Sequence, residues 1–231
     1  MTFGHGPATI ANGIPDLIKT RTLSIDPDAS GLDQASGIAA DLRLGAVMAY
    51  PTETFYALGA AALTKKAVDR VFRLKKREAS KPLSFIVSDM DMVGDVVASL
   101  PLPFMTLAAE FWPGPLTLVL RAADGLPEAL LGPGRTIALR IPPIAWLRDL
   151  VRDLGEPLTA TSANLSGEAG LSDPNEVRRL FDGQVDLIVD SGPSPGGTPS
   201  TIVDLTGERP RILREGRIPA ARIEALLRGP T

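Results

Sequence analysis

The chain has 231 residues, 44% of them hydrophobic, and a mean hydropathy of +0.12, so it can bury the core of a globular domain and is not of the disordered class. Its net charge of −3 and pI of about 5.3 exclude a global basic field of the kind that drives non-specific nucleic-acid binding. It has no cysteine, which excludes disulfides and cysteine-ligated zinc, and its only histidine is His5, so histidine-based catalysis is not expected.

Residues 1–21 predict an N-terminal extension. They contain three glycines and two prolines and show no sustained hydrophobic period. They also lack the basic stretch and apolar block of a secretory leader, and no run in the chain approaches the roughly 18 to 20 apolar residues of a membrane span. We therefore expect a flexible extension over 1–21, one domain over 22–231, no membrane contact and a cytoplasmic location.

The rest of the chain alternates between apolar runs of strand length and segments with helical spacing. Short apolar and β-branched runs predict strands at 22–25, 46–50, 83–87, 116–120, 136–141, 157–161, 185–189, 200–204 and 211–213. Apolar residues three or four apart predict helices at 35–45, 65–76, 90–100, 103–111, 144–154, 175–181 and 219–227. Several strands lie too close in sequence for a crossover helix, so the predicted fold class is α/β with a mixed sheet and flanking helices.

Four short motifs place hydroxyl, amide or cationic groups beside these apolar runs. They are PTET at 51–54, KKR at 75–77, SAN at 162–164 and PST at 199–201. Together they indicate a site that handles anions. The Gly-rich stretch at 196–201 could cradle a phosphate with backbone N–H groups, but the chain has no Walker A sequence, so this stretch alone is weak evidence.

The cations of the KKR motif have two interpretations. Lys75 and Arg77 lie at the end of a predicted helix, where cations stabilise the helix dipole by roughly 0.3–1 kcal/mol and are usually solvated. Lys75, however, shares a helical face with Val68, Val71 and Phe72, so it should point towards the core. A core-facing cation needs an anion, and this favours a role in a site.

Other polar residues leave alternatives open. Ser162 and Asn164 follow an apolar strand, where such residues form local turns but where ligands also dock in α/β sheets. Arg140 interrupts an apolar strand, and a buried arginine must be paired or bind a ligand. Glu53 is the one acid in the motifs, and it could be a base, a magnesium ligand or a partner for the cations.

Seven motifs, in their order, resemble those of one family. They are YPTETFYALG (50–59), LKKR and KPL (74–83), FWPGPLTLVL (111–120), TIALRIP (136–142), TSANLSG (161–167), PSTIVDL (199–205) and ILREG (212–216). Each is weak alone, but together, over about residues 22–228, they are similar to the YrdC family, the threonylcarbamoyl-AMP synthases. The resemblance implies a twisted open mixed α/β sheet with a large concave cavity, in the short single-domain form.

The resemblance also implies an activity. A nucleotidyltransferase of this family converts L-threonine, bicarbonate or CO2, and ATP into threonylcarbamoyl-AMP and pyrophosphate, and its product passes to enzymes that make threonylcarbamoyladenosine in tRNA. By motif, the threonine-binding residues would be Thr52, Arg140 and Ser200. The ATP-binding residues would be Lys75, Arg77, Thr136, Ser162, Asn164 and Arg214, and the catalytic ones among them Lys75, Arg77, Ser162 and Asn164.

Such an enzyme positions its reactants and neutralises charge, so cations and hydrogen-bond donors suffice without a side-chain nucleophile. A magnesium ion would be held by the ATP phosphates and water, with no side-chain ligand predicted. The chain departs from the family pattern at Ala57, where glycine is usual, and at 84–87 and 169–172, which lack the usual histidine and P-S-P-T stretch.

Two other functions stay open. One is an RNA-binding or ribosome-assembly relative of the fold; the acidic pI disfavours more than a weak RNA contact. The other is carbamoyl transfer to an acceptor other than threonine. Dependence on threonine would separate this second function from the synthase.

Overall fold

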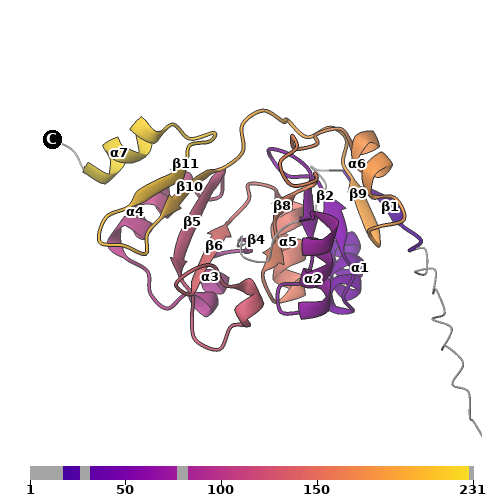
Figure 1. The fold of residues 1–231 in the computed structure, drawn as a ribbon, viewed down its shortest axis with the longest axis horizontal. Coiled ribbons are helices and arrows are strands. Elements are labelled where there is room, and N and C mark those ends of the chain that lie inside the picture. Colours follow the sequence, from indigo (N-terminus) through magenta and orange to yellow (C-terminus); the bar gives the residue numbers. More distant parts are fainter. Residues whose placement is uncertain (1–17, 27–31, 77–82, 229–231) are drawn as a thin grey trace, which may run out of the picture.

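Two β-sheets, which lie side by side in Figure 1, organise the molecule. The computed structural model describes residues 18–26, 32–76 and 83–228. The first sheet has the spatial order β1 (Arg21–Ser24), β9 (Leu187–Asp190), β2 (Met48–Tyr50), β3 (Ala57–Gly59) and β8 (Thr161–Ser162). The second has the order β11 (Arg211–Arg214), β10 (Thr201–Asp204), β5 (Leu116–Arg121), β6 (Thr136–Arg140), β4 (Ser84–Ile86) and β7 (Leu158–Thr159).

Both sheets contain parallel and antiparallel pairs. In the first sheet β1 runs parallel to β9 while β2 is antiparallel to β3, and in the second β4 is parallel to β6 while β5 is antiparallel to β6. The predicted α/β class with mixed pairing is therefore confirmed. The strands divide between two sheets, however, where the sequence predicted one.

Helices flank the sheets and follow the predicted periods closely. They are α1 (Leu32–Arg43), α2 (Lys65–Leu74), α3 (Met90–Val96), α4 (Leu102–Phe111), α5 (Ala145–Leu154), α6 (Pro174–Phe181) and α7 (Ala220–Arg228). A 3-10 turn covers Glu128–Leu130. Gly155 ends α5 in the left-handed conformation, and Asp173 caps α6 by accepting a hydrogen bond from the amide of Asn175. No described helix is long and apolar enough to cross a bilayer.

The first sheet is covered by α1 and α5. The periodic residues Ile38 and Leu42 of α1 are buried and belong to one apolar cluster with Leu147 of α5, Met48 of β2 and Val189 of β9. Figure 1 shows these two helices packed together beside the strands of the first sheet. This packing explains why the spacing of apolar residues in α1 could be recognised from the sequence.

The strand predicted at 157–161 is divided between the sheets. Its first half, β7, pairs with β4 in the second sheet, and its second half, β8, pairs with β3 in the first. The amide of Ala160, between the halves, donates to the carbonyl of Ser84. An apolar run shows that a segment is extended and buried, but not which neighbour it pairs with.

The predicted boundary between the extension and the domain, at residues 21 and 22, stays a prediction. Residues 1–17 of the predicted extension are outside the described residues. Near its end, the hydroxyl of Thr20 donates to the carbonyl of Val185 over 2.6 Å, and Arg21 begins β1. These contacts join residues 20 and 21 to the first sheet.

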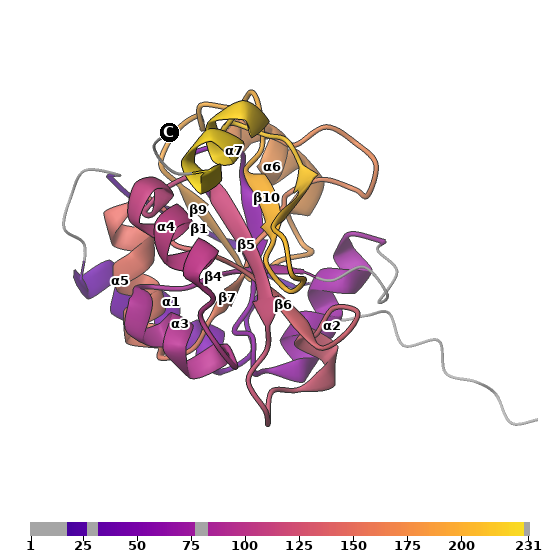
Figure 2. The ribbon, with the colours of Figure 1, turned by 90° about the vertical axis from the view of Figure 1, so that its left-hand side faces the viewer.

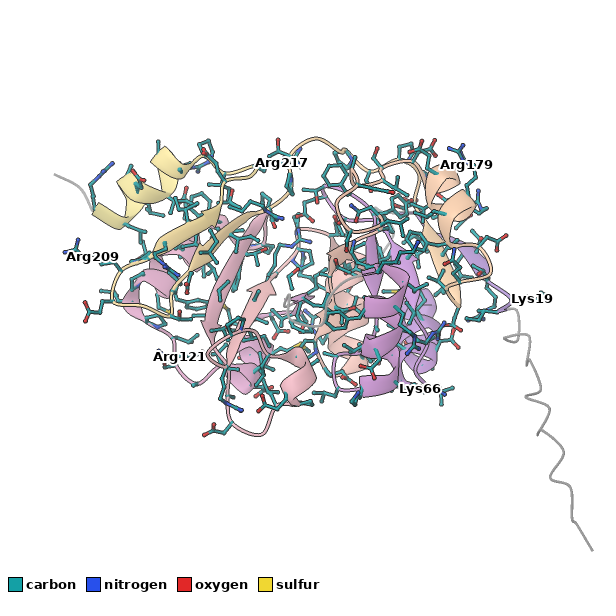
Figure 3. The ribbon with its side chains drawn as sticks, in the orientation of Figure 1. Lys19, Lys66, Arg121, Arg179, Arg209 and Arg217 are labelled. Atoms are coloured by element: carbon teal, nitrogen blue, oxygen red, sulfur yellow. The ribbon has the colours of Figure 1, made fainter. Side chains whose placement is uncertain are left out.

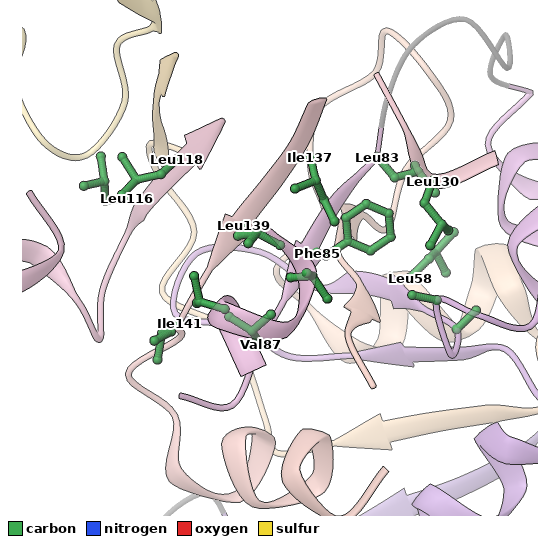
Figure 4. Packing of buried hydrophobic residues seen from close by; sticks show 14 of the residues in the cluster. Leu58, Leu83, Phe85, Val87, Leu116, Leu118, Leu130, Ile137, Leu139 and Ile141 are labelled. Carbon is green, nitrogen blue, oxygen red and sulfur yellow. The ribbon is translucent and has the colours of Figure 1, made fainter. Parts of the chain in front are cut away.

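The second sheet has two different faces because side chains alternate along β5 and β6. Leu116 and Leu118 of β5 and Ile137 and Leu139 of β6 point into the main core, where Phe85 of β4 packs beside them (Figure 4). Helices α3 and α4 lie to one side of this sheet in Figure 2. The residues between these core positions point the other way and line a cavity.

Candidate active site

A cavity of about 410 Å³ is lined by residues of both sheets. Its floor is the second face of the second sheet, with Thr117 and Val119 from β5 and Ala138 and Arg140 from β6. The opposite wall is formed by the turn between β2 and β3 and by β8. This volume lies within the range of roughly 300–1,000 Å³ that is typical of small-molecule sites.

Five of the predicted site residues line this cavity. They are Thr52, Arg140, Ser162, Ser200 and Arg214. They come from segments far apart in the chain, and the two sheets bring them together. The threonine-binding residues expected from the motifs all belong to this group.

The other predicted residues lie elsewhere. Lys75 and Asn164 are buried behind the cavity wall and do not line it. Thr136 is half-buried at the start of β6, and its hydroxyl donates to the carbonyl of Pro133 over 3.2 Å. Arg77 lies outside the described residues. Their expected roles towards ATP remain predictions.

The PTET motif forms a tight turn between β2 and β3. The amide and the hydroxyl of Thr52 both donate to the carbonyl of Phe55, over 3.2 and 2.6 Å, and the amide of Thr54 donates to the Thr52 hydroxyl over 3.2 Å. Such hydrogen bonds hold a turn in one conformation. The turn therefore places Thr52 and Thr54 at the cavity and fixes the backbone of Glu53 between them.

Arg140, the last residue of β6, forms an ion pair with Glu53. The two side chains are 8% and 12% exposed, so the pair is almost fully removed from water. Burial lowers the pKa of Arg140 to about 10, the coulombic effect of Tyr50 raises it and the nearby Arg214 lowers it further. The guanidinium remains a cation at neutral pH and supplies the cavity floor with a positive charge.

Lys75 is fully buried, as its position on the apolar face of α2 predicts. Its ammonium donates to the carbonyl of Ser162, to the carbonyl of Asn164 over 3.0 Å and to the side-chain oxygen of Asn164. The hydroxyl of Ser162 donates to the same side-chain oxygen over 2.6 Å. Lys75 therefore holds the SAN segment in the conformation that presents Ser162 to the cavity.

A second hydroxyl cluster connects the PST motif with β5 and β11. The hydroxyls of Ser200 and Thr117 lie 3.0 Å apart, and Arg214 donates to the carbonyl of Ser200 over 2.8 Å. Burial lowers the pKa of Arg214. Thr117 was not singled out from the sequence, although it is the polar residue of an alternating Leu-Thr-Leu pattern. That alternation was the signal that could have placed it opposite the core.

No group of three or more histidine, cysteine or acidic side chains that could hold a metal ion occurs among residues 18–26, 32–76 and 83–228. The carboxylate beside the cavity, Glu53, is engaged by Arg140.

A family model for Sua5, YciO and YrdC, described as "Telomere recombination", matches residues 40–216. The chain belongs to the Sua5/YciO/YrdC family. Among the relatives of this family member, the threonylcarbamoyl-AMP synthase of Pyrococcus abyssi is 37% identical over 186 residues, which are 80% of this chain and 55% of that protein.

Solved structures of family members agree with this fold. P. abyssi Sua5 complexed with L-threonine superposes with a TM-score of 0.84 at 34% identity, over 90% of this chain and 61% of that one. YciO of Escherichia coli superposes with a TM-score of 0.78 at 30% identity, over 88% of this chain and 98% of that one. This chain thus spans somewhat more than half of the P. abyssi proteins and nearly all of YciO.

Proposed function

We propose that this chain is an L-threonylcarbamoyladenylate synthase, a nucleotidyltransferase that forms threonylcarbamoyl-AMP and pyrophosphate from L-threonine, bicarbonate or CO2, and ATP. The observation that carries the proposal is Arg140, a buried cation on the floor of a small-molecule cavity, with the hydroxyls of Thr52 and Ser200 lining the same cavity. A P. abyssi relative bears the synthase name, and a solved P. abyssi Sua5 structure contains L-threonine.

In this reaction the threonine amine adds to CO2 to give a carbamate, and a carbamate oxygen then attacks the α-phosphorus of ATP and expels pyrophosphate. Arg140 would hold the threonine carboxylate, and Thr52 and Ser200 would orient the amino acid by hydrogen bonds. No covalent bond to the protein forms. Catalysis would rest on holding the carbamate in line with the phosphate and on neutralising the charge that develops.

ATP would occupy the part of the cavity near Ser162 and Arg214, with Lys75, Arg77, Thr136 and Asn164 as the further residues proposed for it. Lys75 would then act by shaping the SAN segment as well as by its charge, because its ammonium is bonded to that segment. Magnesium would be carried by the ATP phosphates and water, where it would neutralise phosphate charge.

The whole domain, residues 22–231, would carry this activity, with 1–21 as an extension. The product would serve enzymes that modify tRNA, which makes the cytoplasm the expected compartment. A direct RNA-binding role has less support, because the labelled basic side chains Lys19, Lys66, Arg121, Arg179 and Arg209 lie far apart around the molecule in Figure 3 and the net charge is −3.

The test is pyrophosphate release by the purified chain from ATP and bicarbonate, with and without L-threonine, and with serine, valine and glycine as controls. Mass spectrometry of the reaction mixture would identify threonylcarbamoyl-AMP. Threonine-dependent release is the expected result. Release that depends on another acceptor would change the substrate, and no release together with no ATP binding would overturn the synthase.

A further inference from the structure

One carboxylate oxygen beside the cavity has no hydrogen-bond partner in the described part of the chain. The Oε1 atom of Glu53 accepts from Arg140, but Oε2 is buried and no donor among residues 18–26, 32–76 and 83–228 reaches it. A buried acceptor left without a donor destabilises the folded state, and more so when it belongs to a charged group. A ligand in the neighbouring cavity can supply the missing donor.

The cavity lies next to Glu53 and can hold a ligand that supplies this donor. The neighbouring residues Thr52 and Thr54 line the cavity, and the backbone carbonyl of Glu53 accepts from Arg217 over 2.7 Å. Figure 3 shows Arg217 between the two halves of the molecule. Glu53 itself does not line the cavity, and Oε2 would reach a ligand there by rotation about the terminal torsion of the side chain, which is broad in glutamate.

Arg140 and Glu53 together form a pair of opposite charges beside one cavity. An α-amino acid carries the complementary pair, an anionic carboxylate and a cationic ammonium on the same carbon. Among the described residues Arg140 donates only to Glu53, through one of the five N–H groups of its guanidinium. The remaining donors can take the substrate carboxylate while Glu53 takes the ammonium.

We propose that Glu53 is a catalytic residue that binds the amino group of the amino-acid substrate and accepts the proton released when this amine becomes a carbamate. This role rests on the proposed synthase function and deepens it. The ammonium first donates to Glu53, which leaves a neutral amine with a free electron pair. The nitrogen then bonds to the carbon of CO2. The electron pair of one C–O π bond moves onto its oxygen, which gives the carbamate anion.

The protons balance in this sequence. An ammonium has three N–H bonds and the carbamate nitrogen keeps one, so two protons leave. Glu53 takes the first proton before the attack and releases it to water. Glu53 then takes the second proton from the nitrogen after the new N–C bond has formed. No oxidant or reductant is needed. Among the described residues, the charged and titratable groups around Glu53 are Arg140 on β6, Arg217, and, through Arg140, Tyr50 on β2 and Arg214 on β11.

Binding to the wild-type chain gives the first test. L-threonine is compared by calorimetry with (R)-3-hydroxybutanoate, which is the same molecule without the amino group. A hydrogen bond to a charged group is worth about 1.5–3 kcal/mol, so we expect threonine to bind roughly 10- to 100-fold more tightly. If both bind equally well, Glu53 does not contact the amine and the proposal is overturned without any variant.

The Glu53→Gln variant gives the second test. The amide keeps the shape and an acceptor for Arg140 but cannot take a proton. We expect the preference for threonine to fall to within about threefold, and kcat for pyrophosphate release to fall by about 10²–10⁴, the usual contribution of a general base. ATP affinity should be unchanged. At higher pH, where more threonine is present as free amine, the loss should shrink.

Glu110→Gln is the matched control, since Glu110 pairs with Arg222 on the exposed surface and should behave as wild type. If Glu53→Gln keeps the preference for threonine or the wild-type kcat, Glu53 has no such role although the synthase function stands. If the wild-type chain itself shows no threonine-dependent pyrophosphate release, the synthase function fails, and the role of Glu53 fails with it.

Discussion

Lys75 and Arg140 are both buried cations, but the molecule surrounds them differently. Lys75 lies behind the cavity wall and donates to three oxygens of the SAN segment. Arg140 lies on the cavity floor, where its only described partner is Glu53, itself left with an unpartnered oxygen. Burial removes water from both cations. Oxygen atoms of the protein replace the lost hydrogen bonds fully at Lys75 and incompletely at Arg140.

This difference separates two kinds of role. A cation with all its donors used stabilises the segment that it bonds and has little capacity left for a ligand. A cation with donors facing a cavity has that capacity. Variants at the two positions should therefore differ in how stability and ligand binding change.

The largest effect on stability is expected at Arg140. Arg140→Met removes one partner of a buried ion pair and leaves Glu53 charged and unpaired, so the free energy of unfolding should fall by about 3–5 kcal/mol. Threonine binding should be lost as well. Chemical denaturation of Arg140→Met and of the double variant with Glu53→Gln checks this, because the double variant should recover part of the loss. A double variant as unstable as Arg140→Met would contradict the pairing.

The next effect is expected at Lys75. Lys75→Met leaves buried oxygens of Ser162 and Asn164 without their donor, so the free energy of unfolding should fall by about 2–4 kcal/mol. Because the SAN segment loses its conformation, ATP affinity should fall too, while threonine binding at Arg140 is retained. Denaturation and calorimetry with each substrate measure this. Unchanged stability would show that the ammonium does not hold the segment.

A smaller effect is expected at Ser162. Ser162→Ala removes a hydroxyl that donates to the Asn164 side chain over 2.6 Å, and stability should fall by about 1 kcal/mol. The hydroxyl also faces the cavity, so the rate of pyrophosphate release should fall at least tenfold. Thermal melting and steady-state kinetics together test the assignment. A rate equal to that of wild type would place Ser162 outside the ATP site.

The smallest effect on stability is expected at Arg214. Its side chain is exposed at the rim of the cavity, and it donates to the Ser200 carbonyl. Arg214→Ala should change the free energy of unfolding by less than about 0.5 kcal/mol, as is usual for accessible positions. ATP affinity should weaken several-fold. A loss of threonine affinity instead would assign Arg214 to the amino acid.

The sequence could predict the direction of single side chains but not their partners. Lys75 was expected to face the core because helical spacing put it on the same face as Val68 and Val71, and it is buried there. Arg140 was expected to be buried because it interrupts an apolar strand. Its pairing with Glu53, 87 residues away, depends on how the two sheets meet, and no local pattern contains that information.

The same limit explains what was missed among the strands. Short β3 has only three residues, too few for a recognisable alternation, and the 157–161 run gave no sign that it changes sheets. The motif order, in contrast, identified the family from residues alone. Patterns fixed by chemistry at one site can be recognised along the chain, whereas pairing between distant strands is set by the complete packing.

The change of sheet at Ala160 has a mechanical consequence. The amide of Ala160 donates to the carbonyl of Ser84 in the second sheet over 2.7 Å. Three residues later, the amide of Ala163 donates to the carbonyl of Tyr56, next to the first sheet, also over 2.7 Å. One continuous backbone therefore bridges the cavity floor and the opposite wall. Widening the cavity at this end would break these backbone hydrogen bonds, so they oppose a separation of the two sheets there.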